Sequence, residues 1–154
     1  MLTKLKYAGV CRKDLIDIYI KFIRSVTEYC CVAWHSSLTQ KQSNSLESIQ
    51  SICLKIILGR DYTTYSEALS KCNLQTLFDR REDRVLKFSL KCIKHPQNKR
   101  LFPLNKNVRS GLRRIEPFQV NFSHTSDYKN SAIPYCQRKL NNHMTRKAPI
   151  PPGN

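Results

Sequence analysis

Residues 24–59 read RSVTEYCCVAWHSSLTQKQSNSLESIQSICLKIILG, and this stretch decides the fold. On each side of the polar turn 35–39, apolar residues recur every three or four positions, as in amphipathic helices. Thr39 suits the N-cap of the second helix, because its hydroxyl can accept a hydrogen bond from a first-turn N–H. Gly59 suits the end of that helix, because glycine adopts positive φ without a Cβ penalty. We therefore expect an antiparallel helical hairpin that Trp34 closes.

The apolar positions of both helices are expected to form two facing, buried stripes. The first stripe comprises Leu15, Ile18, Tyr19, Phe22, Ile23, Val26, Tyr29, Cys30 and Ala33, and the second comprises Leu46, Ile49, Cys53, Ile56 and Ile57. Such stripes stabilise a helical pair by removing apolar area from water.

The rest of the chain predicts further helices and few strands, so the expected fold class is all-α. A capping-box pattern at 64–67 starts a short helix, and a longer helix runs over 77–94 with Thr76 as its cap. Residues 131–142 can form one more short helix. We expect a helical domain over 1–103 and a basic, partly irregular tail over 104–154.

The net charge of +16 is large for 154 residues and grows toward the C-terminus. Residues 1–59 contribute +4, residues 60–100 contribute +5 and residues 101–154 contribute +7. A strongly basic chain favours a polyanionic partner, and nucleic acid is the commonest one. The alternative is an ordinary solvated surface with an excess of lysine.

The seven cysteines indicate reduced thiols rather than disulfides or a metal site. Their number is odd and the sequence contains no C-x-x-C pair, so we expect neither zinc nor another cofactor. No apolar run reaches transmembrane length and no signal peptide is evident, which favours an intracellular protein, cytoplasmic or nuclear, without membrane contact. Nothing in the sequence indicates an oligomeric state.

Six basic residues on the 77–94 helix form the best candidate site. They are Arg80, Arg81, Arg84, Lys87, Lys91 and Lys94, and most share one face by their spacing. Such a row can follow a phosphate backbone, whereas the alternative is a solvated face. Arg81 can instead pair with Glu67 or Glu82.

Arg60 joins the candidate nucleic-acid-binding residues because two tyrosines lie next to it in the sequence. Tyr62 and Tyr65 can stack on a base, or they can cover the core.

Several separated blocks resemble the region that follows the catalytic palm in reverse transcriptases of non-LTR (jockey-like, LINE-type) retrotransposons. The matching residues are Ile23, Arg24, Val26, Glu28, Tyr29, Trp34 and His35, then Leu46, Glu47, Ile49 and Gln50. Further matches lie at 65–69, 80–82, 101–103 and 128–135. Ser25 departs from the family pattern, which often has proline there, so the resemblance gives weaker support for a kink at this position.

The resemblance implies a thumb-like helical region of an RNA-directed DNA polymerase that contacts the template–primer duplex through its backbone. It also implies an upstream palm domain as partner, and hence that this chain is a truncated C-terminal fragment. The catalytic aspartate pair of the family is missing, so no catalytic residue is assigned. The alternative function is a structural or protein-interaction helical domain, either reused by the host or a decayed remnant.

The missing aspartates predict that the chain alone does not polymerise nucleotides. We expect no primer extension on a primed RNA template with either Mg²⁺ or Mn²⁺, because two metal ions need clustered carboxylates. Gel analysis of a labelled primer measures this, with heat-denatured protein as control. Extension above that control would contradict the prediction.

Overall fold

The structure is a computed structural model that describes residues 1–105, 116–120 and 122–147. Within these ranges all regular elements are helical, and strand-like pairing is limited to an isolated bridge between Leu104 and Phe118. The expected all-α class is confirmed for this part of the chain. The remaining residues of the expected tail, 106–115, 121 and 148–154, lie outside the described residues.

The chain forms two compact units, and their boundary differs from the one expected near residue 103. Unit 1 comprises residues 1–31 and 38–82, and unit 2 comprises residues 32–37 and 83–154. The physical reason is that the apolar residues after 103 share a core with the second part of the 77–94 helix. The described residues of the expected tail, 104–105, 116–120 and 122–147, are therefore part of a folded unit.

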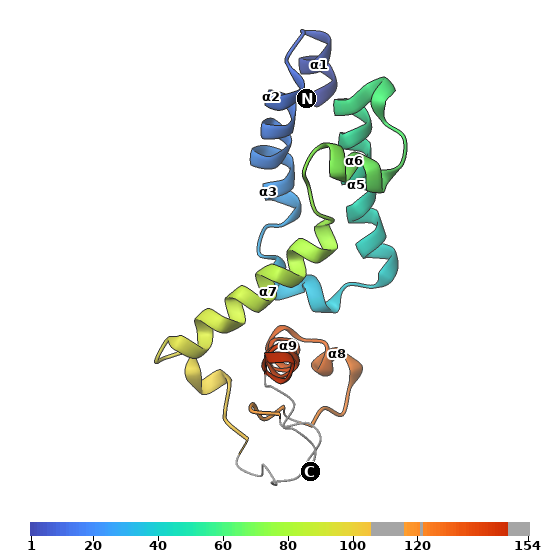
Figure 1. The fold of residues 1–154 in the computed structure, drawn as a ribbon. Coiled ribbons are helices and arrows are strands. Elements are labelled where there is room, and N and C mark those ends of the chain that lie inside the picture. The colour runs from blue at the N-terminus through green and yellow to red at the C-terminus, as the bar shows by residue number, and fades with distance from the viewer. Residues whose placement is uncertain (106–115, 121, 148–154) are drawn as a thin grey trace, which may run out of the picture. The chain divides into compact units, whose positions relative to one another are not determined.

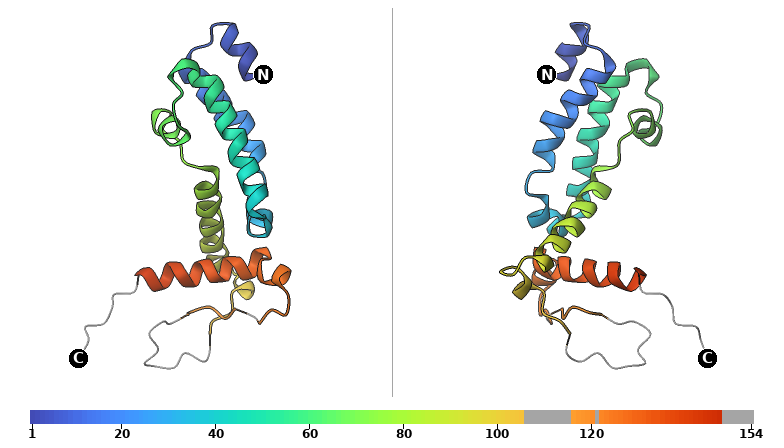
Figure 2. Two further views of the ribbon diagram at one scale, coloured as in Figure 1. Left: turned by 90° about the vertical axis from the view of Figure 1, so that its right-hand side faces the viewer. Right: turned by 60° about the vertical axis from the view of Figure 1, so that its left-hand side comes forward.

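Unit 1 is built on the expected helical hairpin. Its elements are α1 (Leu2–Tyr7), α2 (Arg12–Ile18), a π-helical turn (Tyr19–Ile23), α3 (Arg24–Thr27), α5 (Gln40–Leu58), a 3-10 turn (Gly59–Asp61), α6 (Tyr65–Lys71) and the start of α7 (Leu77–Lys94). Figures 1 and 2 show α2 and α3 beside α5 and antiparallel to it. Leu15 and Tyr19 pack with Cys53 and Ile57 between them, which confirms the hairpin.

The ends of α5 are fixed by the residues that the sequence indicated. The Thr39 hydroxyl accepts a hydrogen bond from Gln42 N at 3.3 Å, and the Gln42 side chain accepts one from Thr39 N at 2.9 Å. Gly59 ends the helix at φ +60°. The ammonium of Lys6 donates to the carbonyl of Ile56 at 2.5 Å, which adds a positive charge at the negative end of the helix dipole.

The first half of the hairpin departs from the expected continuous helix. A π turn at Tyr19–Ile23 adds a residue to the helical period, and Cys30 adopts a left-handed conformation at φ +48°. Residues within and after the π turn are therefore rotated away from the hairpin core. Phe22, Val26 and Tyr29, expected in the buried stripe, have exposed fractions of 61%, 75% and 75%.

Polar side chains of the hairpin hold the start of α7. Glu47 on α5 accepts hydrogen bonds from the backbone N–H groups of Leu77 at 3.3 Å and Phe78 at 2.6 Å, and from the Tyr65 hydroxyl at 2.6 Å. A carboxylate there satisfies first-turn N–H groups and favours the positive end of the helix dipole.

Two further contacts position the segment that enters α7. The Gln50 amide donates to the backbone carbonyl of Gln75 at 2.9 Å. Glu28, 1% exposed, accepts from Arg80 at two atoms, with Nε to Oε1 at 2.6 Å and Nη2 to Oε2 at 3.2 Å. A bidentate pair of this kind fixes both distance and orientation.

Unit 2 has its own core, to which the C-terminal segment contributes half. Its elements are most of α4 (Cys31–Trp34), a 3-10 turn (His35–Ser37), the rest of α7, a 3-10 turn (Lys99–Leu101), α8 (Ser126–Lys129) and α9 (Ala132–Lys147). The buried core residues are Val85, Cys92, Phe102, Phe118, Cys136 and Leu140.

The expected short helix over 131–142 is α9, which runs five residues further. The Asn141 side chain accepts from the N–H of Phe118 and donates to its carbonyl, both at 2.9 Å. It thus makes the two backbone hydrogen bonds that a neighbouring strand would make.

Trp34, which we expected to close the hairpin of unit 1, is half-buried and belongs to unit 2.

Arg80→Met should lower the free energy of unfolding by roughly 3 kcal/mol, because it removes a bidentate charged partner of the buried Glu28 carboxylate. Urea denaturation followed by circular dichroism measures the change. Lys87→Met, on the exposed face of the same helix, is the matched control and should change stability by less than about 0.5 kcal/mol. An unchanged denaturation midpoint for Arg80→Met would contradict the structural role of the pair.

Candidate nucleic-acid interface

The part of α7 in unit 2 separates apolar and basic side chains onto opposite sides. Val85 and Cys92 are 1% and 3% exposed and lie in the core. Arg84, Lys87, Lys91 and Lys94 are exposed and recur at spacings of three and four, so they share the outer face. The core packing of the helix therefore holds four of the predicted site residues in one row.

Lysines on this helix have no neutralising partner within the described residues. No hydrogen bond or ion pair joins Lys87, Lys91 or Lys94 to another residue of ranges 1–105, 116–120 or 122–147. Like charges four positions apart, as in Lys87 and Lys91, destabilise a helix by a few tenths of a kcal/mol. Phe88 lies between them in sequence and is 40% exposed. An anion bound along this row would relieve the repulsion.

Arg80, predicted to contact phosphate, is a structural residue of unit 1. Its guanidinium is engaged by both carboxylate oxygens of Glu28, and its side chain is only 24% exposed. The sequence placed it in the basic row correctly by spacing, but a buried acidic partner 52 positions away takes up its charge.

Arg81 is wrongly placed at the surface by the sequence prediction, because its side chain is 0% exposed. It precedes Val85 by four positions, so it lies on the buried side of α7. Its Nη2 donates to the Ser43 hydroxyl at 3.1 Å. Burial lowers the pKa of Arg81, and the nearby Glu47 charge opposes that shift.

Arg60 is exposed, as expected, but it belongs to unit 1 and the lysine row belongs to unit 2. The structure therefore does not bring them together in one unit. The neighbouring tyrosines are half-buried and bonded, since Tyr62 shares a hydrogen bond with Ser51 at 3.1 Å and Tyr65 donates to Glu47. The two tyrosines therefore agree with the alternative that they cover the core.

Most of the net positive charge lies in unit 2. A division of the chain at residue 103 would not show this. Unit 2 contains 15 Lys and Arg against 3 Asp and Glu, whereas unit 1 contains 12 against 8. The excess basic charge of the chain is thus concentrated in the unit that holds Lys87, Lys91 and Lys94.

Two basic residues that the sequence prediction missed lie on α9. The charged groups of Arg138 and Lys139 lie 5.8 and 5.7 Å from the centre of the Tyr135 ring, within cation–π range. Tyr135 also meets His35 edge to face at 6.0 Å. The signal that could have found them is the Arg-Lys pair beside an aromatic residue within a helical pattern.

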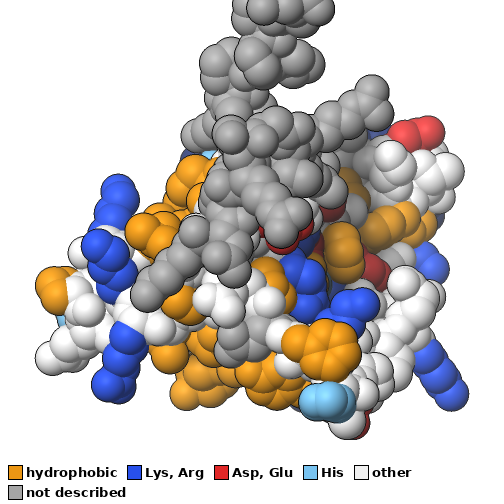
Figure 3. Space-filling view, turned by 90° about the horizontal axis from the view of Figure 1, so that it is seen from below, with side chains coloured by type: hydrophobic (Ala, Val, Ile, Leu, Met, Phe, Trp, Pro, Cys, Tyr) orange, Lys and Arg blue, Asp and Glu red, His pale blue; other side chains and the backbone are white. Residues whose placement is uncertain are grey.

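Figure 3 shows the side-chain types on the face of the molecule seen from below. Lys and Arg side chains lie among groups of hydrophobic side chains there, and acidic side chains are few.

No group of three His, Cys, Asp or Glu side chains is placed to hold a metal ion in the described part of the chain. The cysteines are all free, and burial raises the pKa of Cys53, Cys72, Cys92 and Cys136. A raised pKa lowers the thiolate fraction, which opposes a nucleophilic role.

Within the described ranges, no helix combines the length and the apolar character needed to cross a bilayer. Comparison of the chain with protein-family models, with curated proteins and with solved structures gave no match. The reverse-transcriptase resemblance therefore rests on the sequence blocks alone.

Thiol reactivity tests this description of the cysteines. Iodoacetamide at neutral pH should modify the exposed Cys11 and Cys30 first, because the other five thiols are buried and four of them have a raised pKa. Peptide mass spectrometry over a time course measures the order, with urea-denatured chain as the control in which all seven react. Early modification of Cys92 or Cys136 would contradict it.

Proposed function

We propose that the chain binds the backbone of nucleic acids without reading their sequence, through the outer face of α7 in unit 2. The observation that carries the proposal is the row of Arg84, Lys87, Lys91 and Lys94, in which the three lysines have no partner within the described residues. Phosphate contacts of this kind position a duplex but carry no base information.

The dimensions of the row suit a duplex. Ten residues separate Arg84 from Lys94, and a rise of 1.5 Å per residue extends the row over about 15 Å. Double-stranded DNA carries one charge per ~1.7 Å of axis, so a row of that length faces several phosphates at once. Release of their counterions then supplies the affinity.

The sequence blocks support a more specific context for this binding. Their resemblance to the post-palm region of non-LTR reverse transcriptases makes a template–primer duplex of RNA and DNA the proposed ligand. In that context the chain grips the duplex and is not itself catalytic, because the sequence has no adjacent aspartates.

A second candidate function is contact with another protein, and a specific observation favours it. Phe22, Val26 and Tyr29 form an exposed apolar row on the hairpin of unit 1. Contiguous exposed apolar surface is typical of protein interaction sites. A palm domain, expected from the resemblance, is the partner that this candidate names.

The triple variant Arg84→Gln, Lys87→Gln, Lys91→Gln tests the proposed function. The log–log dependence of duplex affinity on salt should flatten by about 2–3 units, near one for each lost phosphate contact. Arg80 stays unchanged, because its side chain pairs with Glu28 and its loss would destabilise unit 1 rather than remove a phosphate contact. Fluorescence anisotropy with a labelled RNA–DNA duplex at several salt concentrations measures the slope.

The matched control changes three exposed lysines of unit 1, Lys4, Lys13 and Lys41, to glutamine. It removes the same total charge and leaves every basic residue after position 41 in place, so its slope should stay near that of the parent chain. An equal change of slope in both variants, or none in the triple variant, would reject α7 as the interface. The protein-contact function would then be favoured.

A further inference from the structure

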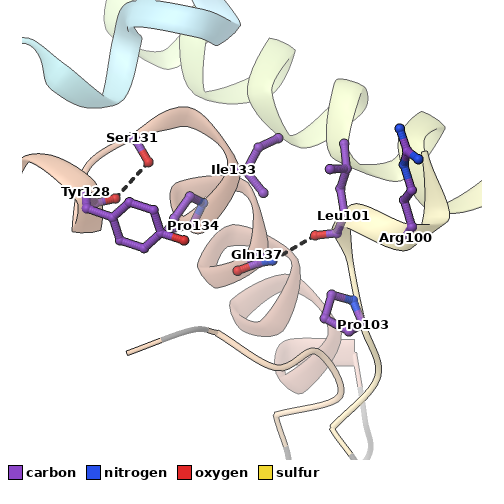
Figure 4. Close-up of a pocket in the computed structure, with 8 residues that line it drawn as sticks. All are labelled: Arg100, Leu101, Pro103, Tyr128, Ser131, Ile133, Pro134 and Gln137. Atoms are coloured by element: carbon purple, nitrogen blue, oxygen red, sulfur yellow. Dashed lines mark hydrogen bonds between the residues drawn. The ribbon is translucent and has the colours of Figure 1, made fainter. Parts of the chain in front are cut away.

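Unit 2 contains a pocket of about 390 Å³ that the phosphate-binding row does not use. Its walls are mostly apolar, with Leu101 and Pro103 on one segment and Ile133 and Pro134 on α9 (Figure 4). This volume lies within the range of small-molecule sites, which combine apolar walls with a few placed polar groups.

The placed polar group is the side chain of Gln137. It is 3% exposed, and its Nε2 donates to the backbone carbonyl of Leu101 at 2.8 Å. Its Oε1 is buried and accepts no hydrogen bond from the described residues. Exchanging the nitrogen and oxygen of the amide would not solve this, because Oε1 would then face the carbonyl oxygen of Leu101, and both atoms are acceptors.

A buried acceptor without a donor is costly, so the site favours a ligand that brings an N–H or O–H group. Figure 4 shows the free oxygen of Gln137 on the side of Tyr128, away from Leu101. The donor of the ligand would therefore lie between Gln137 and the tyrosine.

Tyr128 supplies an aromatic wall on a fixed backbone. Its ring lines the pocket and the residue is 47% exposed. Its N–H donates to the Thr125 hydroxyl oxygen at 3.2 Å, and its carbonyl accepts from the Ser131 hydroxyl at 2.7 Å. A half-exposed ring held in this way is suited to stack on a planar ligand at little entropic cost.

A cationic rim completes the site. Arg100 lines the pocket, and its guanidinium points away from Gln137 in Figure 4, so it would meet an anion outside the apolar part. Unit 2 has a fivefold excess of basic over acidic residues, 15 against 3. Together these groups suit a flat ring with an N–H donor that is attached to a phosphate.

We propose that this pocket binds one unpaired nucleobase of a single-stranded nucleic acid. The base stacks on Tyr128, its amino group donates to Gln137 Oε1, and its phosphate lies near Arg100. Single-stranded nucleic acids are recognised elsewhere by the same combination of stacking and edge hydrogen bonds. The proposal deepens the proposed function, on which it rests for the choice of nucleic acid as ligand.

The test compares fluorescein-labelled RNA strands of equal length by anisotropy with the full chain. One strand contains adenosine, one contains purine riboside, which lacks the exocyclic amine, and one is abasic. All carry the same phosphates, so backbone binding contributes equally. Adenosine should bind about tenfold more tightly than purine riboside, which is the worth of one hydrogen bond to an otherwise unpaired acceptor, and the abasic strand should bind most weakly.

Protein variants separate stacking from general charge. Tyr128→Ala should lose about tenfold in affinity for the adenosine strand and nothing for the abasic strand, whereas Tyr128→Phe should keep both. Tyr7→Ala, at an exposed tyrosine of unit 1, is the matched control and should change neither. These variants leave the core residues in place.

Equal affinity for all three strands, together with no effect of Tyr128→Ala, would overturn the base-binding pocket. That result differs from failure of the backbone function, which appears as an unchanged salt slope in the Arg84, Lys87, Lys91 variant. A strand preference that persists in that variant would support the pocket independently.

Discussion

The attachment of α7 to the helical hairpin is the constraint on which unit 1 depends. Glu47 accepts from two N–H groups at the start of α7 and from the Tyr65 hydroxyl, so one carboxylate joins α5, α6 and α7. Glu28 and Gln50 hold the same region through Arg80 and the Gln75 carbonyl. The two N–H groups that meet Glu47 and the bidentate Glu28–Arg80 pair each require a defined geometry, so this arrangement admits few alternatives.

The same constraint divides the arginines and lysines of α7 by role. Arg80 and Arg81, in its first turns, bond to the buried side chains of Glu28 and Ser43 in unit 1. The basic residues further along the helix are exposed in unit 2. A polar core residue such as Arg81 gives up its hydration and contributes to the specificity of the packing, whereas an exposed lysine retains a charge that a ligand can neutralise. One helix thus carries both structural and candidate binding residues.

Local signals in the sequence predicted much of this fold. Thr39 and Thr76 cap the starts of α5 and α7, and Gly59 caps the end of α5, as expected. These positions were predictable because capping depends on a few adjacent residues. Long-range pairing was not predictable, since nothing near Arg80 indicates Glu28. Gln137 was also missed as a site residue, because its free oxygen results from contacts with a segment 36 positions away. The prediction of which side of the first helix faces the core was wrong from the π turn onward, because the spacing of apolar residues does not indicate such a turn.

That π turn links two features of unit 1 that otherwise look unrelated. A π turn acts like one residue inserted into a regular helix, and it rotates everything after it by about 100°. The insertion turns Phe22 and Val26 outward, and it also sets the direction in which Glu28 meets Arg80. A shortening of Tyr19–Ile23 by one residue would reverse both effects, so the apolar surface and the buried ion pair would be lost or kept together. The two are therefore expected to change as one unit in any sequence that shares this hairpin.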